Sequence, residues 1–173
     1  MARRSIRLAD PDAAGSAALA ARFARVRAEL NIPEAFPPEV LAAARAEARS
    51  PHEAPADLTD IPFITVDPPG TVDLDQAMFL SRRGDGYHVD YAIADVPAFV
   101  DPSGPVAAEA MHRGQTLYAP DRRVQRDPPV LSEDAASLLP GRTRPAFVWR
   151  FDLDARGEVV ATDLVRALSL IHI

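Results

Sequence analysis

The sequence predicts a mixed α/β fold of the α+β kind, in which a mixed sheet with flanking helices follows a short helical segment. Two pairs of strand-like segments support this prediction, residues 76–82 with 87–94 and residues 145–153 with 158–168. Each pair flanks a short turn that contains aspartate and glycine, which is typical of β-hairpins. Helical patterns stand before and between these pairs rather than between single strands, so the order argues against an alternating βαβ nucleotide-binding fold.

Residues 1–57 are expected to form an N-terminal helical segment followed by a linker. Apolar side chains recur at helical spacing in its first part, at Leu19, Phe23, Val26 and Leu30. This spacing predicts a helix from a cap at Ser16 to about Leu30, and the prolines that open residues 37–49 favour a second helix. Residues 50–60, SPHEAPADLTD, have the composition of a linker. Two such helices can form a small RNA-binding module or can pack against the main domain, and the sequence leaves both alternatives open.

An acidic segment follows an expected strand at residues 61–67. Asp67 ends the strand, a Pro-Pro-Gly turn follows, and Asp73, Asp75 and Gln76 come directly after it. Two carboxylates about 5 Å apart repel each other by roughly 3 kcal/mol at an effective dielectric constant near 20. A hard divalent cation removes this repulsion, and Mg²⁺ prefers oxygen ligands. The segment therefore predicts a magnesium site for phosphodiester chemistry, held by Asp67, Asp73, Asp75 and Gln76.

Two other interpretations of this acidic segment stay open on spacing alone. Aspartates after Pro-Gly commonly form a solvated turn, because their side chains hydrogen-bond to nearby backbone groups. The pattern Asp-x-Asp also occurs in enzymes that use sugar nucleotides. A calcium-binding EF-hand loop is a poor match, because Met78 and Gly84 stand where such a loop, counted from Asp73, needs a glycine and a glutamate.

The later elements continue the α+β pattern. Asp95 ends the second strand of the first hairpin, where it can join the metal ligands or accept hydrogen bonds from the next turn. Residues 103–113 predict a helix that ends at a glycine. Residues 115–130 are expected to be an extended segment and then a Pro- and Arg-rich loop. Ser132 is expected to cap a short helix that ends near Leu139.

Composition limits the partners and the compartment that we expect. Hydrophobic residues make up 47% of the 173 residues, which is enough for a folded core. The formal net charge of −6 argues against a generally basic surface for nucleic acid, and all 19 basic residues are arginine. Because the sequence has no cysteine, we expect no disulfide partner and no thiolate zinc site. No apolar run approaches the roughly 20 residues of a membrane span, and the N-terminus lacks a secretion signal, so we expect no membrane partner and a cytoplasmic protein.

Five blocks of the sequence stand out along the main domain. They are TVDPPGTVDLDQAMFL, YHVDYAIADVPAFVDPSGPV, RGQTLYAPDR, PPVLSEDAASLLP and FVWRFDLDARGEV. In this order they resemble the first part of the catalytic RNB domain of the ribonuclease II/R family. The resemblance covers residues 58–167 and implies an RNB-like domain that is incomplete. The acidic motif of the family has four aspartates; Asp67, Asp73 and Asp75 match the first three, and the uncharged Gln76 stands in the place of the fourth.

This resemblance implies the function of the parent protein, which is Mg²⁺-dependent 3′→5′ hydrolysis of single-stranded RNA to nucleoside 5′-monophosphates. Asp73, Asp75 and Gln76 would be the catalytic residues. Tyr118 would hold the 3′-terminal nucleotide, as a tyrosine of that block does in the family. The arginines expected to contact RNA phosphates, or alternatively to form a solvated loop, are Arg113, Arg122, Arg123 and Arg126. The alternative functions are a non-catalytic RNA- or metal-binding fragment and an Asp-x-Asp sugar-nucleotide transferase.

Residues 168–173, LSLIHI, are expected to be a non-native tail. They can be back-translated as CTGTCTCTTATACACATC, the transposon end that is used in preparing sequencing libraries. We therefore expect the native frame to be interrupted near Leu168, and the alternative interpretation is a genuine apolar strand end. Because the family completes its active site with later Arg and Glu residues, the chain alone is expected to be inactive.

Overall fold

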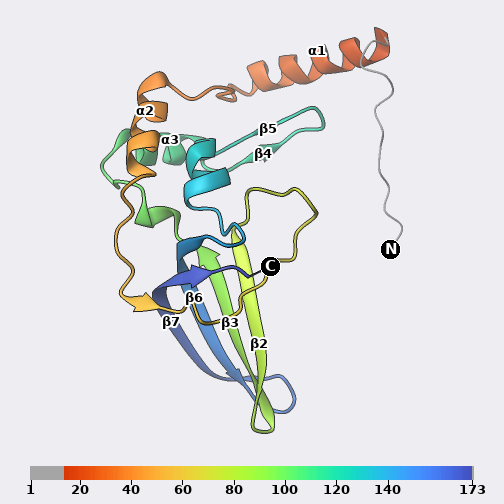
Figure 1. The fold of residues 1–173 in the computed structure, drawn as a ribbon. Coiled ribbons are helices and arrows are strands. Elements are labelled where there is room, and N and C mark those ends of the chain that lie inside the picture. The colour runs from red at the N-terminus through yellow and green to blue at the C-terminus, as the bar shows by residue number, and fades with distance from the viewer. Residues whose placement is uncertain (1–13, 173) are drawn as a thin grey trace.

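The computed structural model describes residues 14–172 and contains a five-stranded mixed sheet (Figure 1). The strand order is β1-β7-β6-β3-β2, with β1 parallel to β7 and the other neighbouring pairs antiparallel. The strands of this sheet are β1 Ala56–Asp57, β2 Gln76–Arg83, β3 Gly86–Ala94, β6 Thr143–Leu153 and β7 Val159–Leu170. Both predicted hairpins, β2–β3 and β6–β7, are present, and the predicted α+β class with a mixed sheet is confirmed.

The helices lie toward one end of the sheet (Figure 1). They are α1 Ala14–Glu29, α2 Pro38–Glu47 and α3 Pro105–Arg113, with a 3₁₀ turn at Val96–Ala98 and a π-helical turn at Leu131–Ala135. Proline begins both α2 and α3, where its missing N–H removes no helical hydrogen bond. A two-stranded sheet, β4 Leu117–Tyr118 with β5 Arg123–Val124, extends from the same end. Among the helices of residues 14–172, none is long and apolar enough to cross a membrane.

Two hydrophobic clusters hold these elements together. The first lies on one face of the sheet and includes the fully buried Phe63 and Leu138. The second cluster packs the helices and turns at the end of the sheet against one another. It includes the fully buried Val106 of α3 and Leu131 of the π-helical turn. Because residues 131–138 contribute to both clusters, this segment couples the helical end of the molecule to the sheet.

The expected strand at residues 61–67 is not formed. Phe63 makes a single parallel bridge with Ile171, and Ile64 makes an antiparallel bridge with Met78. Consecutive residues thus pair with different neighbours, and Pro62 has no N–H to donate to a ladder. The apolar run contributes to the core through Phe63 without forming a regular strand.

The first helix is present, and the apolar stripe that predicted it is only partly buried, with Leu19 and Phe23 half-buried. Val26 is 46% exposed and Leu30 is 66% exposed, whereas Arg27 is only 4% exposed. Nη1 of Arg27 donates to the two carboxylate oxygens of Asp121 at 2.9 and 3.0 Å. The buried Arg27 therefore ties α1 to the β4–β5 loop through an ion pair. Ser16 lies inside α1 and not before it, so the predicted cap is wrong.

Two segments that were expected to be irregular contain short strands. Ala56–Asp57, in the expected linker, pairs with β7, and β5 forms within the expected loop at residues 121–130. Ser132 is not a helix cap, because the π-helical turn already begins at Leu131. The hydroxyl of Ser132 reaches backbone carbonyls only at 3.4 and 3.5 Å, which is too long for a strong bond.

The C-terminal residues belong to the sheet. β7 continues to Leu170, and the next residue, Ile171, is fully buried and bridges to Phe63. The placement fits an apolar strand end, whatever the origin of these residues, so their non-native origin stays a prediction. The limits 1–57, 58–167 and 168–173 also stay predictions, and the ends of the outer two segments, residues 1–13 and 173, lie outside the described residues.

Candidate functional site

The acidic segment before β2 is held in place by backbone hydrogen bonds. The Ser137 hydroxyl accepts a bond from the Leu74 N–H at 2.9 Å and donates to the Val72 carbonyl at 2.7 Å. The Leu138 N–H donates to the Leu74 carbonyl at 2.8 Å, and Ala94 of β3 donates to the Asp75 carbonyl at 2.9 Å. These bonds fix the chain on both sides of Leu74 at the start of β2.

Asp73 and Asp75 stand on either side of Leu74, whose side chain is buried in the core. In an extended segment successive side chains point to opposite sides, so both carboxylates face away from the core. Both line one cleft of about 480 Å³ between the start of β2 and the β4–β5 hairpin. The polar and aromatic side chains that share this cleft are Asp73, Asp75, Gln115, Thr116, Tyr118, Arg126, Asp127, Ser132 and Ser137.

Tyr118 projects from β4 into this cleft. Its partner in the two-stranded sheet is Arg123, and the next pair, Leu117 with Val124, supplies the buried side of the hairpin. Tyr118 is 75% exposed, so it is not an ordinary packed tyrosine. Its ring is available for stacking against a planar ligand in the same cleft that Asp73 and Asp75 line.

The four predicted phosphate-binding arginines lie in different surroundings. Arg113 is wrong for this role, because its side chain is only 2% exposed and its Nε pairs with Glu109 at 2.7 Å. The rest of its guanidinium donates to the carbonyls of Pro33, Ala35 and Gln125. Arg113 therefore joins the α1–α2 connection to α3, and its nearly buried guanidinium makes four hydrogen bonds within the protein.

The other three arginines stay accessible. Arg122 is 53% exposed in its side chain and pairs with Glu34 at 2.5 Å. Arg126 lines the cleft, and its Nε donates to Asp127 at 2.9 Å. Nη1 of Arg123 donates to Asp73 at 2.6 Å, and Nη2 of Arg123 contacts Glu133. Contact of these residues with RNA stays a prediction.

The structure does not bring the predicted metal ligands together. Asp67 is exposed on the far side of the Pro-Pro-Gly turn and does not line the cleft. Gln76 accepts a hydrogen bond from the Tyr91 hydroxyl, and Asp73 is neutralised by Arg123. Within the part of the chain that the structure describes, no group of three or more histidine, aspartate or glutamate side chains is placed to hold a metal. The residues as they are placed therefore do not form the predicted magnesium site.

Asp95 has a structural role at the end of β3. It is fully buried, accepts a hydrogen bond from the Ala98 N–H at 3.0 Å and pairs with the guanidinium of Arg166. The interpretation in which Asp95 accepts hydrogen bonds from the next turn is confirmed, and the burial of both oxygens in these contacts excludes a role as an open metal ligand.

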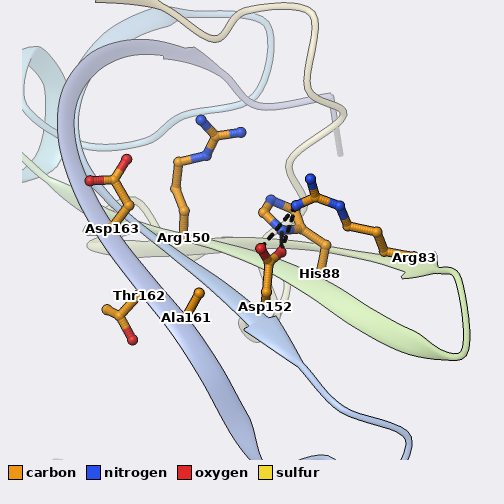
Figure 2. A pocket seen from close by; sticks show the side chains of 7 residues that line it. All are labelled: Arg83, His88, Arg150, Asp152, Ala161, Thr162 and Asp163. Carbon is orange, nitrogen blue, oxygen red and sulfur yellow. Dashed lines mark hydrogen bonds and ion pairs between the residues drawn. The ribbon is translucent and has the colours of Figure 1, made fainter.

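A second hollow, of about 280 Å³, lies at the opposite end of β2 from the cleft (Figure 2). Asp152 of β6 accepts hydrogen bonds from Arg83 at 2.8 and 3.0 Å and contacts Nδ1 of His88 at 2.6 Å. Arg150 donates to the buried Asp90 at 3.0 Å. The hydrogen bond to His88, and next the bond and charge of Arg83, lower the pKa of Asp152 below the ordinary value of 3.8 for an aspartate. Because these charges neutralise one another across neighbouring strands, we infer that this cluster stabilises the pairing of the strands.

Sequence reasoning missed the residues that position the acidic segment. Ser137 is 2% exposed and carries two of the bonds to residues 72–74, yet it stands 63 residues after Leu74. Glu133 and Gln125 were also missed, although Gln125 donates to Glu133 at 2.7 Å and Glu133 in turn contacts Arg123. No local pattern indicates such contacts, because each depends on how the π-helical turn folds over the start of β2.

Comparison with known proteins identifies the family. Residues 56–170 match the model of the RNB domain. The chain is 38% identical over 104 residues to exoribonuclease 2 of Edwardsiella piscicida, which covers 60% of this chain and 16% of that protein. It is 39% identical over 105 residues to the inactive exonuclease DIS3L2 of Arabidopsis thaliana, which covers 60% of this chain and 10% of that protein.

The fold agrees with this match. The structure of Mycoplasma genitalium RNase R in complex with ribose-methylated single-stranded RNA superimposes with a TM-score of 0.80 at 26% identity. The superposition covers 87% of this chain and 24% of that one, so the chain spans a minor part of the proteins that it resembles. By sequence and by fold, the chain belongs to the RNB-domain family of ribonucleases II and R.

Proposed function

We propose that the parent protein is a 3′→5′ exoribonuclease that hydrolyses single-stranded RNA to nucleoside 5′-monophosphates. One observation carries the proposal, which is that the exposed ring of Tyr118 and the carboxylates of Asp73 and Asp75 line the same cleft. A cleft of about 480 Å³ is within the range of sites that bind small ligands, so it can receive a terminal nucleotide. The RNB family assignment supports the same chemistry and removes the basis for a sugar-nucleotide transferase.

In this proposal Tyr118 stacks on the terminal base, which is worth about 1–3 kcal/mol and does not depend on the base sequence. Arg126 lies in the same cleft and provides a cation for the phosphate that follows. Asp75 places its exposed carboxylate beside the scissile bond, because its backbone is fixed by Ala94. We propose Mg²⁺ as the cofactor, because carboxylate oxygens such as those of Asp73 and Asp75 are the ligands that Mg²⁺ prefers.

A second candidate function is non-catalytic binding of RNA. It is favoured by the neutralisation of Asp73 by Arg123 and by the uncharged Gln76, which is hydrogen-bonded to Tyr91. The RNB fold does not decide between the two functions, since one similar protein is named an inactive exonuclease. The two candidates share the RNA cleft and differ only in whether a phosphodiester bond is broken there.

The experiment that separates them incubates the parent protein with 5′-labelled single-stranded RNA in Mg²⁺. We expect the labelled strand to shorten from its 3′ end while nucleoside 5′-monophosphates accumulate. The Tyr118→Ala variant should bind and shorten the RNA about 5- to 150-fold less well, because it loses the stacking surface. Binding of RNA without any shortening would replace the proposed function by the second candidate, and internal cleavage would contradict both.

A further inference from the structure

Arg123 lies where it can oppose a cation in the cleft. It donates from Nη1 to Asp73 at 2.6 Å and contacts Glu133 through Nη2. The side chains of Arg123, Asp73 and Glu133 are 34%, 31% and 27% exposed, so water screens this bridge only in part. Asp73 lines the cleft, and the guanidinium beside it supplies the positive charge that a divalent cation would otherwise bring to this carboxylate.

The two ends of this bridge are not equivalent. Oε1 of Glu133, which Arg123 contacts, also accepts a hydrogen bond from the amide of Gln125 at 2.7 Å. Asp73 sits in a segment whose backbone is fixed by Ser137, and its side chain can turn without moving the chain. Arg123 can therefore leave Asp73 and remain bound to Glu133, so the exchange of one partner does not require the β4–β5 hairpin to open.

We propose that Arg123 is a positioning residue that competes with a divalent cation for Asp73 and so sets the metal affinity of the cleft. The proposal rests on the proposed function for the identity of the cleft. Arg123 bonds Oδ2 of Asp73, and a metal ion on either oxygen of this carboxylate would lie close to the guanidinium, so their positive charges repel. Removal of the guanidinium should therefore strengthen metal binding.

The test measures Mn²⁺ binding to the 173-residue chain by electron paramagnetic resonance of the unbound ion. We expect Arg123→Gln to lower the dissociation constant for Mn²⁺ about tenfold relative to the wild-type chain. Arg83→Gln is the matched control, since it removes the same charge from an arginine that also pairs with an aspartate, at the far end of β2 (Figure 2). Screening over that distance should keep the effect of Arg83→Gln below about twofold.

A double-mutant cycle with Glu133→Gln tests whether Glu133 acts through Arg123. In the wild-type background, Glu133→Gln leaves Arg123 with Asp73 as its carboxylate partner, so Mn²⁺ should bind several-fold more weakly. In the Arg123→Gln background the same change should have little effect. Equal effects in the two backgrounds would mean that Glu133 acts on the cation directly, which contradicts the proposal.

Near-ultraviolet circular dichroism of Trp149, which lies on β6, reports whether each variant is folded. If Arg123→Gln does not fold, Arg123→Met takes its place, because methionine also removes the charge and keeps a long side chain. Arg123→Met should also bind Mn²⁺ more tightly than the wild type. The proposal is overturned if the affinity of the folded Arg123 variant equals that of the wild type or of Arg83→Gln. No RNA is present in this assay, so its outcome is independent of whether the parent protein cleaves RNA.

Discussion

Removal of the Ser137 hydroxyl should loosen the acidic segment. In Ser137→Ala the Leu74 N–H loses its partner at 2.9 Å and the Val72 carbonyl loses its partner at 2.7 Å. Ser137 is 2% exposed, so water does not readily replace these bonds. A buried donor left unpaired costs about 1–3 kcal/mol, and we expect a loss of about 2 kcal/mol in the free energy of unfolding. For a chain of this size that loss lowers the melting temperature by about 4–8 °C.

Urea unfolding of the 173-residue chain, followed by the fluorescence of Trp149, measures this loss. Ser132→Ala is the matched control, since Ser132 lies in the same segment and its hydroxyl reaches carbonyls only at 3.4 and 3.5 Å. We expect the control to change the free energy of unfolding by less than about 0.5 kcal/mol. A Ser137→Ala variant as stable as the control would refute the reasoning that Ser137 clamps the acidic segment.

Three further predictions concern the cleft and the sheet. Gln76→Asp adds a negative charge next to Asp75, which lines the cleft, so half-maximal activity of the parent protein should need less Mg²⁺; an unchanged requirement would place Gln76 outside the metal environment. Asp152→Asn should destabilise the chain at pH 7, and this deficit should shrink as the pH falls below 3.8, because the lowered pKa of Asp152 stabilises the fold only while the carboxylate is charged. Urea midpoints at pH 7 and pH 3 check this, and an equal deficit at both would contradict it. The 173-residue chain, which spans 16% of its Edwardsiella relative, should release no measurable mononucleotide from RNA in Mg²⁺, and release near the rate of the parent protein would contradict this.

The two hairpins could be predicted from the sequence because local signals determine them. Alternating apolar residues mark β3, and Gly84, with a positive φ of 60°, supplies the turn that joins it to β2. The strand at residues 61–67 could not be excluded, since an apolar run looks the same whether it pairs with one neighbour or bridges to two. The burial of Arg27 in α1 could not be predicted, because its partner Asp121 is 94 positions away along the chain.

The candidate site could be predicted in its residue types but not in its contacts. The spacing of Asp73 and Asp75 around an apolar residue places both carboxylates on one side of the chain, and the structure has them in one cleft. The pairing of Asp73 with Arg123 joins residues that are 50 positions apart, so it depends on the tertiary fold. The prediction that Arg113 binds RNA phosphates was wrong because its contacts with the carbonyls of Pro33 and Ala35 also depend on the tertiary fold. The local sequence does not indicate them.

The most direct test of the central claim compares two exposed aspartates at the two ends of β2. Asp75 lies in the cleft, and Asp85 lies in the β2–β3 turn, and both are exposed. The measurement is the rate at which the parent protein releases nucleoside 5′-monophosphates from single-stranded RNA, together with its affinity for that RNA. We predict that Asp75→Asn slows release by at least about 10²-fold while RNA binding is kept, and that Asp85→Asn changes neither quantity. Near-normal release by Asp75→Asn would contradict the assignment of this cleft as the site of hydrolysis.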